Sequence, residues 1–273
     1  MYSSFADARA DLYTRWLLSK VAKPSLGDGP TVVMTTHATR MLTAHHSIRC
    51  ILGGTVRPGR FIVYVPSAPT PNLLAFKDVG AEIVQCDPKG VHDKWYHYSQ
   101  QNSEPFVTVD DDFVYPPDLL ATICAAVACA PTFITAMRAR YVQQSHYAQW
   151  PLADNTQPSH LHMALGCGGV YYPEQMVTAM KWSRTDFLKL CPKADDLWLK
   201  RLAIEAGIRV RLGVLNRPLP LLSPGTPGTG LWHENVTNGK NDEQWGALLT
   251  DTMREVLLRE VDNHYEATRH KKG

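Results

Sequence analysis

Apolar runs that alternate with segments of helical spacing dominate the first hundred residues. The run TVVMTT (31–36) is rich in β-branched residues and predicts a strand, and apolar positions at helical spacing follow it over 37–52. The runs 60–66 and 82–86 predict two more strands, with a short helix between them. Strands that alternate with helices are typical of a mostly parallel sheet, so the pattern predicts an α/β fold.

A buried strand that runs directly into acidic residues is the main feature of the middle of the chain. The segment PFVTVDDDFVYP (105–116) carries three consecutive aspartates straight after an apolar run. A helix that begins with prolines and a further strand over 132–138 follow it. Ligands of open α/β sheets bind beyond the carboxyl ends of strands, so function is expected at these aspartates.

The second half of the chain mixes polar loops with shorter periodic segments. Residues 143–162 are polar and predict an active-site loop that leads into the glycine-rich turn ALGCGGVYYP (164–173). Helical spacing recurs over 194–207, and a short strand is predicted after it. A closing helix is predicted with Asn241 as its N-cap and Gln244 as the capping-box partner.

An amphipathic helix is predicted at the N-terminus. Over residues 5–22, apolar positions such as Leu12 and Trp16 lie close to one helical face, and a Lys-Pro pair and a Gly-Asp-Gly-Pro turn end the pattern. Packing on the domain is the expected role, and a homodimer contact and peripheral membrane association are the alternatives. The chain is therefore divided into an N-terminal helix (1–23) and one α/β domain (24–273).

Composition and charge fit one globular domain. The 273 residues are 44% hydrophobic and 20% charged, with a net charge of +2, which gives no electrostatic basis for nucleic acid as a partner. Acids and arginines interrupt the beginning of the chain, so no export signal is predicted and a cytoplasmic location is expected. The six cysteines lack CxxC pairs and metal-ligand spacing, which predicts reduced thiols without a disulfide framework or a zinc site.

The aspartates at positions 110–112 carry the strongest chemical signal. Adjacent carboxylates repel one another unless a cation lies among them, and hard oxygen ligands select Mg²⁺ or Mn²⁺. The segment VTVDDDFVYP resembles the DxD region of GT-A glycosyltransferases of the family 2 type. The GCGGVYYP turn and the ADDLWLK segment follow in the order that these enzymes show, and the resemblance spans roughly residues 31–250.

The resemblance implies a fold, a reaction and a metal site. The fold is a GT-A domain, a Rossmann-like α/β fold with a mostly parallel sheet. The reaction is the transfer of a sugar from a nucleotide-diphosphate donor to a hydroxyl of a glycan, a lipid-linked or another acceptor, as in polysaccharide biosynthesis. Mn²⁺ or Mg²⁺ stabilises the departing diphosphate. By the resemblance, Asp110 faces the donor nucleotide and Asp112 holds the metal, with Asp110 and His233 as further metal ligands and Asp111 assisting.

A glycine turn and an acidic pair complete the predicted centre. Gly168 and Gly169 resemble the glycine loop that lies against donor and acceptor, although a tight turn between strands needs the same glycines. Asp195 and Asp196 fall where inverting GT-A enzymes carry an acidic pair, which implies Asp196 as the general base and Asp195 in support. Acids at a helix start also act as caps, so both interpretations stay open.

Four further residues are weaker candidates for donor binding. Thr35, Thr36 and Arg40 follow the first strand, where GT-A enzymes hold the nucleotide, and Arg40 is placed to reach a phosphate. Lys94 lies one helix before the aspartates and is a second phosphate candidate. The alternatives are ordinary helix-terminal residues and a solvated lysine. Aromatic residues of the two predicted loops suit either stacking on sugar rings or core packing: Tyr147, Trp150 and Trp232.

Three other functions fit parts of the pattern. Asp110 and Asp112 also satisfy the DxDxV motif of haloacid-dehalogenase-like, Mg²⁺-dependent phosphatases, as nucleophile and acid. That motif normally ends the first strand of its sheet, whereas three strands are predicted before Asp110. A nucleotidyltransferase would need a glycine-rich loop after the first strand, which TTHATRM lacks, and a non-catalytic carbohydrate-binding protein would not need clustered acids.

Overall fold

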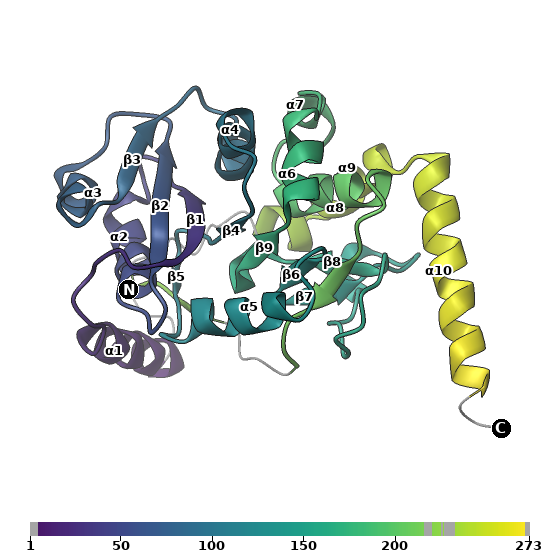
Figure 1. The fold of residues 1–273 in the computed structure, drawn as a ribbon, viewed down its shortest axis with the longest axis horizontal. Helices are drawn as coiled ribbons and strands as arrows, with labels where there is room; N and C mark the ends of the chain where they lie inside the picture. The colour runs from purple at the N-terminus through teal and green to yellow at the C-terminus, as the bar shows by residue number, and fades with distance from the viewer. Residues whose placement is uncertain (1–4, 216–219, 225, 227–232, 271–273) are drawn as a thin grey trace.

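A seven-stranded sheet forms the centre of the molecule in the computed structural model (Figure 1). The structure describes residues 5–215, 220–224, 226 and 233–270, apart from the side chains of 5–11, 42, 233–234 and 263–270. The strands lie in the order β10 (Val210–Leu212), β6 (Ile134–Ala136), β9 (Val170–Tyr172), β4 (Phe106–Thr108), β1 (Gly29–Thr35), β2 (Pro58–Val65) and β3 (Glu82–Gln85). Only β9 runs antiparallel to its neighbours within this sheet, so the predicted mostly parallel α/β sheet is confirmed.

Two small antiparallel pairs accompany the central sheet. They are β5 (Phe113–Val114) with β11 (Leu221–Leu222), and β7 (Ala139–Tyr141) with β8 (His162–Ala164). The sequence pattern did not predict these pairs as separate strands, because segments of two or three residues are too short to show a period.

Helices cover both faces of the sheet (Figure 1). One face carries α4 (Asp93–Gln101), α6 (Glu174–Lys181), α7 (Phe187–Leu190), α8 (Asp195–Glu205) and α9 (Lys240–Leu248). The other carries α1 (Phe5–Ser19), α2 (Met41–Leu52), α3 (Pro71–Leu74) and α5 (Leu119–Ala128). Helix α10 (Asp251–His270) stands at the end of the molecule opposite α1. No helix of the described part of the chain has both the length and the apolar character that crossing a membrane requires.

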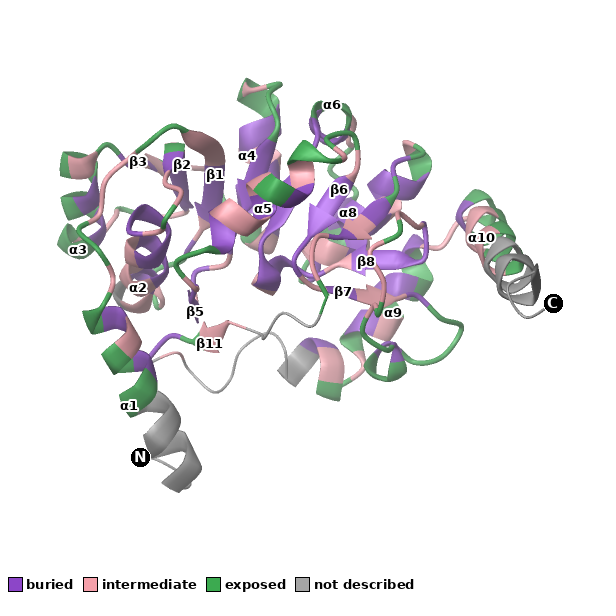
Figure 2. Cartoon of the chain, turned by 60° about the horizontal axis from the view of Figure 1, so that its bottom comes forward, coloured by how far each residue is buried: buried purple, intermediate pink, exposed green. Residues whose placement is uncertain are grey.

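The strands are buried on both faces, which explains their continuous apolar sequences. In β2, Ile62 and Tyr64 belong to the core under α4, and Phe61, Val63 and Val65 belong to the core under α2. None of these five side chains is more than 2% exposed. Figure 2 shows the same strands as a buried band between helices with exposed outer surfaces. A strand covered on both sides reads as an apolar run because both sets of alternating residues are buried.

The N-terminal helix packs on the domain with a face other than the predicted one. Leu18 and Thr14 are 6% and 2% exposed, and Leu18 joins the core under α2. Leu12 and Trp16, which were expected on the packed face, are 67% and 53% exposed. The prediction of this face is wrong because the buried face of the helix is formed by Thr14 and Leu18, which lie one turn apart. The division of the chain at residue 23 stays a prediction.

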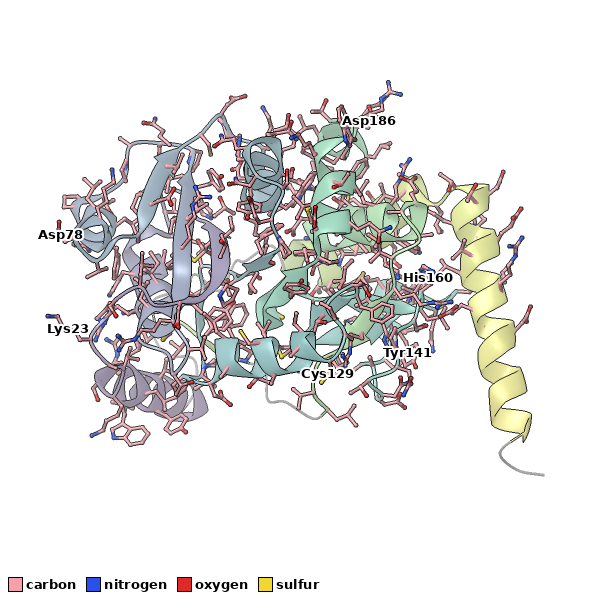
Figure 3. The ribbon with its side chains drawn as sticks, in the orientation of Figure 1. Lys23, Asp78, Cys129, Tyr141, His160 and Asp186 are labelled. Carbon is pink, nitrogen blue, oxygen red and sulfur yellow. The ribbon has the colours of Figure 1, made fainter. Side chains whose placement is uncertain are left out.

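The closing helix is interrupted, and its predicted cap is wrong. Helices α9 and α10 are separate elements, and Gly239, with a φ of 72°, precedes α9. Asn241 lies inside α9 and is buried, and Gln244 Oε1 accepts a hydrogen bond from Lys193 N over 3.0 Å. The backbone N–H of His160, labelled in Figure 3, donates to Glu260 of α10 over 3.1 Å. Tertiary contacts therefore replace the local capping box.

The polar segment 143–162 is more ordered than a mobile loop would be. Tyr147 and Trp150 are 6% and 1% exposed, so core packing is confirmed for both. The indole N–H of Trp150 donates to the backbone oxygen of Ser145 over 3.0 Å. Trp232 lies outside the described residues. The six cysteines, all within the described residues, are not joined by disulfide bonds in this structure.

Candidate active site

The carboxyl ends of β1 and β4 meet at one edge of the sheet. The two strands are parallel neighbours, with Val33 opposite Thr108. Thr36 follows β1, and Asp110 follows β4 after one residue. The backbone N–H of Asp110 donates to the hydroxyl oxygen of the buried Tyr115 over 2.8 Å, which fixes the turn after β4. The aspartates therefore begin where the sheet ends.

Asp111 is held by the protein itself. It is 5% exposed, and its two oxygens accept hydrogen bonds from Thr36 Oγ1 at 2.6 Å and from Arg40 Nη1 at 3.0 Å. Burial raises the pKa of Asp111, although Arg40 and Thr36 act in the opposite direction. The contact of Thr36 and Arg40 with this aspartate places both residues at the predicted edge, and it gives Asp111 a structural role between β1 and β4.

Asp112 lies close to two other carboxylates and has fewer stabilising contacts than Asp111. Burial, followed by the charges of Asp110 and Asp111, raises the pKa of Asp112 to about 7. Arg40 Nη1 lies 3.2 Å from Asp112 Oδ2 and partly offsets the repulsion. The backbone oxygen of Asp112 accepts a hydrogen bond from Ser223 N over 2.7 Å. A carboxylate with so high a pKa gains from a nearby cation.

Lys94 connects the aspartates after β4 with the acidic pair that opens α8. Lys94 Nζ lies 2.6 Å from Asp110 Oδ1 and 3.1 Å from Asp195 Oδ2, and the residue is only 5% exposed. Burial lowers the pKa of this lysine, but the charges of Asp110, Asp195 and Asp196 outweigh it and raise the pKa well above its usual value. The contact with Asp195 Oδ2 lies outside hydrogen-bond geometry, and that buried oxygen has no hydrogen-bond partner.

Gly166 brings Asp110 next to Asp196. A Cβ atom at Gly166 would lie 3.3 Å from Asp110 Oδ1 and 3.3 Å from Asp196 Oδ1. The backbone N–H of Gly166 donates to both carboxylate oxygens of Asp196, over 3.1 and 3.3 Å. Burial and the charge of Asp195 raise the pKa of Asp196 well above its usual value, against the effect of Lys94. The aspartates after β4 and the acidic pair of α8, far apart in sequence, therefore lie next to each other in the fold.

The acidic pair of α8 does not cap the helix. Ala194 occupies the N-cap position, and no side chain makes a cap hydrogen bond there. Asp196 instead accepts from Gly166, on a different segment. The structure therefore shows tertiary contacts rather than side-chain capping, while both acids still lie in the first turn of α8, where negative charge favours the helix dipole.

Gly168 and Gly169 are explained by packing. A Cβ atom at Gly168 would lie 2.9 Å from Arg138 Cβ, on the segment after β6. Gly169 has a φ of 88°, and its α-carbon faces the side chains of Leu119 and Ile123 on α5. Their predicted donor-binding role stays a prediction, and Gly166 is the glycine that lies beside the carboxylates.

The remaining predicted residues lie further from the carboxylates or outside the description. The hydroxyl of Thr35 donates to the backbone oxygen of Tyr64 over 3.2 Å, within the sheet. The backbone of His233 opens a short π-helical segment, His233–Thr237, but its side chain lies outside the described part, so its metal role stays a prediction. Asn235 and Asp242 each tie a neighbouring segment to this region. Asn235 Nδ2 donates a hydrogen bond to the backbone oxygen of Lys193 over 2.8 Å, and Asp242 Oδ1 accepts one from the backbone N–H of Tyr147 over 2.7 Å.

Sequence reasoning missed Tyr115 and included Gly166 only as a member of the glycine turn. Gly166 is the first glycine of GCGG, but a glycine run does not show which member faces a ligand. Tyr115 follows the aspartates closely and had the local signal of a polar aromatic residue after an acidic turn.

A cavity of about 350 Å³ between α6 and α8, near Trp182 and Arg201, is lined by none of the aspartates at 110–112 or 195–196.

Comparison with solved structures identifies the fold. The mannosyltransferase PcManGT from Pyrobaculum calidifontis, in complex with GDP-Man and Mn²⁺, matches with a TM-score of 0.50 and 15% identity over 92% of this chain and 76% of that chain. TarS from S. aureus matches with a TM-score of 0.49 and 11% identity over 70% of this chain and 36% of that chain, so this chain spans about a third of TarS. No protein-family model and no curated protein matches the sequence. The chain has the GT-A glycosyltransferase fold.

Proposed function

We propose that the chain is a metal-dependent glycosyltransferase that transfers a sugar from a nucleotide-diphosphate donor to an acceptor hydroxyl, with inversion at the anomeric carbon. The observation that carries the proposal is that Asp110 and Asp196 both lie beside Gly166, where an added Cβ atom would be 3.3 Å from an oxygen of each. It supports one centre that joins the strand-end aspartates to a candidate base. The GT-A fold supports the same reaction class, and PcManGT, which shares it, is in complex with a nucleotide sugar and Mn²⁺.

The acidic edge fits a hard divalent cation. Asp110 and Asp112 are the residues that would hold it, because Asp111 already spends both oxygens on Thr36 and Arg40. Burial, followed by the charges of Asp110 and Asp111, raises the pKa of Asp112 to about 7, and a bound cation favours the ionised carboxylate against both effects. When bound, Mn²⁺ or Mg²⁺ supplies Lewis-acid stabilisation of the departing diphosphate. His233 is proposed as a further ligand by the resemblance alone.

Lys94 and Arg40 flank the aspartates with positive charge. Lys94 contacts Asp110 and Asp195, and Arg40 contacts Asp111 and Asp112. Both cations lie at the edge where a diphosphate would enter, so each is placed to exchange part of a carboxylate contact for a phosphate oxygen. Such fixed charges stabilise a leaving group without reorganising at the moment of reaction.

Asp196 is the proposed general base. Its carboxylate accepts the proton of the acceptor hydroxyl as that oxygen bonds to the anomeric carbon and the bond to the diphosphate oxygen breaks. The N–H of Gly166 orients the carboxylate, and burial, followed by the charge of Asp195, raises its pKa and makes it more basic. A carboxylate with a raised pKa is the better base near neutral pH.

The phosphatase alternative is not favoured. Its motif ends the first strand of the sheet, whereas Asp110 follows β4, after three other strands of this sheet in chain order. It also gives no role to Asp196, which lies with Asp110 beside Gly166.

A screen of nucleotide sugars tests the proposal. The purified chain is incubated with each of several UDP- and GDP-sugars and Mn²⁺, and release of the nucleoside diphosphate is measured with and without a chelator. We expect slow hydrolysis of one donor that stops on chelation and is lost in Asp112→Asn. Release of phosphate from an aryl phosphate, without any nucleotide-sugar turnover, would instead establish the phosphatase.

A further inference from the structure

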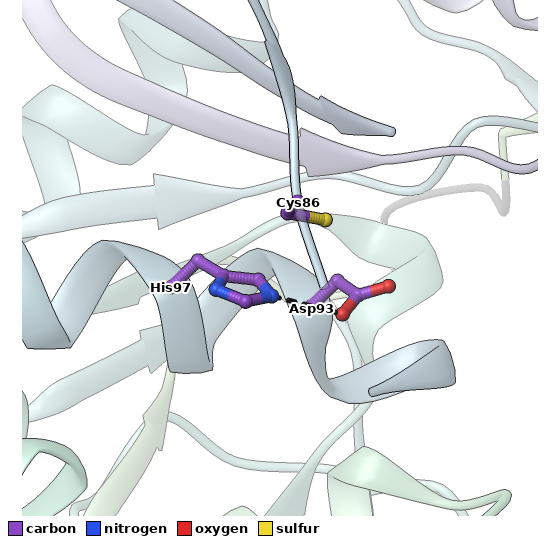
Figure 4. A group of neighbouring side chains, drawn as sticks. All are labelled: Cys86, Asp93 and His97. Carbon is purple, nitrogen blue, oxygen red and sulfur yellow. Dashed lines mark hydrogen bonds and ion pairs between the residues drawn. The ribbon is translucent and has the colours of Figure 1, made fainter. Parts of the chain in front are cut away.

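A second group of metal-ligand side chains lies outside the proposed active site (Figure 4). Cys86 follows β3, and Asp93 and His97 lie one turn apart on α4. Their ligand atoms, a thiol sulfur, a carboxylate oxygen and an imidazole nitrogen, all lie within 4.8 Å of one another. Figure 4 shows the three side chains converging between the strand end and the helix.

The fold builds this cluster with ordinary contacts. The N–H of Cys86 donates to Val65 O over 2.9 Å, which extends the pairing of β3 with β2 and fixes the thiol at the strand end. Asp93 is 2% exposed, and its Oδ1 accepts from Lys89 N at 2.6 Å. The i,i+4 spacing places His97 on the same side of α4 as Asp93, with their atoms 3.2 Å apart.

The cluster does not have the properties of a Cys–His nucleophile. Burial, and then the negative charges of Asp93 and Asp87, raise the pKa of the Cys86 thiol to about 12. An activated thiol needs the opposite shift, toward the thiolate at neutral pH. In addition, His97 Nε2 lies 2.9 Å from the backbone oxygen of Asp87, a pure acceptor, so this nitrogen carries a hydrogen and faces Asp93 rather than serving as a base for Cys86.

We propose that Cys86, Asp93 and His97 bind a zinc ion. A set of one sulfur, one nitrogen and one oxygen suits Zn²⁺ better than Mg²⁺ or Mn²⁺, which prefer oxygen alone. Tetrahedral zinc needs ligand atoms about 3.5 Å apart. The ligand atoms of the cluster lie within 4.8 Å of one another, and His97 Nε2 and Asp93 Oδ1 are already 3.2 Å apart, so binding needs only a small closure of the cluster. One thiolate and one carboxylate neutralise the two charges of the ion, and a water molecule takes the fourth position.

Binding changes the protons of two ligands. The Cys86 thiol loses its proton to solvent as its sulfur bonds to the ion. The hydrogen on His97 Nε2 is replaced by one on Nδ1, so the ring stays neutral and Nε2 is free to coordinate. The contact between Nε2 and the Asp87 carbonyl is given up. Because one proton is released for each ion, the affinity for zinc falls as the pH falls.

The proposed zinc ties β3 to the helix that carries Lys94. Asp93 and Lys94 are consecutive on α4, and Lys94 reaches Asp110 and Asp195. Cys86 lies at the same edge of the sheet as Thr36, because β1, β2 and β3 are parallel neighbours. The zinc site shares no ligand with the proposed Mn²⁺ site, and it stands whether or not the glycosyltransferase proposal holds.

Metal titration of the full chain tests this proposal. The chain is freed of metal with a chelator and titrated with Co²⁺, a spectroscopic substitute for zinc, and then with Zn²⁺. We expect one equivalent to produce thiolate-to-cobalt absorption that zinc abolishes, and zinc to raise the midpoint of thermal unfolding. Cys86→Ser and His97→Gln weaken binding by at least about tenfold, since each removes a ligand. Asp93 is left intact because it also holds Lys89 N.

Two controls separate this site from others. Cys124→Ser, at a partly buried cysteine of α5 outside the cluster, keeps the absorption, and so does Asp112→Asn. If Cys86→Ser does not fold, alkylation of the unmodified chain replaces it: zinc slows alkylation of Cys86 and not of Cys124. Cobalt bound without thiolate absorption, or zinc that leaves Cys86 alkylation unchanged, would overturn the proposal.

Discussion

Two buried lysines, in different parts of the molecule, show what distinguishes a site from a structural contact. Lys94 on α4 is 5% exposed and Lys200 on α8 is 2% exposed, so burial does not separate them. Lys94 lies among the carboxylates of Asp110 and Asp195, and its pKa is raised well above the usual value. Lys200 donates to the backbone oxygens of His160 and His162, over 2.5 and 2.7 Å, and burial lowers its pKa to about 7.

The partners, not the burial, carry the functional information. Lys200 donates to two neutral carbonyls, and of the carboxylates only Glu260 contributes to its pKa, so no group of acids surrounds it. The carboxylates around Lys94 leave one buried oxygen of Asp195 without a hydrogen-bond partner, and they repel one another. Incomplete compensation of this kind is what a ligand can complete. Substitutions in the two regions should therefore affect activity to very different extents.

The largest effect is expected at the proposed base. Asp196→Asn keeps the shape of the side chain and its hydrogen bond from Gly166 but cannot accept the acceptor proton. We expect kcat to fall by about 10²- to 10⁴-fold while Mn²⁺-dependent donor binding is kept. Transfer kinetics and donor titration on the same preparation measure the two quantities. A variant with full activity would remove Asp196 from the mechanism.

The two lysines should differ sharply when each is replaced by methionine. Lys94→Met removes the cation between the acidic groups, and we expect kcat/KM to fall by about 10²-fold. Lys200→Met, the matched control, should leave kcat/KM within about twofold because the hydrogen bonds of this lysine go to the backbone oxygens of His160 and His162, away from the proposed site. Equal losses in the two variants would mean that both lysines are structural.

The stability of the chain should depend on pH through Lys200. Its folded pKa of about 7 lies below the usual lysine value, so between these values the unfolded state binds more protons. The contribution of Lys200 to stability therefore rises with pH, by about 2 kcal/mol from pH 7 to pH 9. Urea unfolding of the unmodified chain and of Lys200→Met at both pH values measures it. The difference between them should move in favour of the lysine as pH rises; an unchanged difference would contradict the lowered pKa.

The smallest effect is expected at Gly166. Gly166→Ala places a methyl group 3.3 Å from Asp110 and Asp196, which forces a shift of a few tenths of an ångström. A displacement of that size should reduce kcat/KM by about tenfold or less. Gly246→Ala is the control, since no atom lies within 4 Å of the added carbon and alanine favours the helix. Its activity should be unchanged.

The sequence predicted the parts of this fold that depend on local pattern. The runs that form β1 and β2 are long and mostly apolar, and the acids at 110–112 follow a strand, so both were predictable. The sequence pattern did not identify the buried face of α1, because Leu12 and Trp16 look as apolar as Leu18. Nor did it predict the break between α9 and α10, since helical spacing continues across it.

The site was predictable in its acids but not in its contacts. Asp110 and Asp196 each follow a local signal, a strand end and a helix start. Long-range packing decides that Gly166, and not Gly168, lies beside both carboxylates. The cluster of Cys86, Asp93 and His97 was missed, and the predicted lack of metal-ligand spacing took no account of a carboxylate as the third ligand. Ligands that converge only through a strand-to-helix connection leave no regular spacing in the sequence.

The most direct test of the central claim is calorimetric titration of the chain with UDP and GDP, with Mn²⁺ present or removed by a chelator. We expect one nucleoside diphosphate to bind with Mn²⁺ present and binding to be lost on chelation. Asp112→Asn should abolish this binding, and Lys200→Met should not. Binding of equal strength without metal, or no binding of either nucleotide by a folded chain, would contradict the central claim.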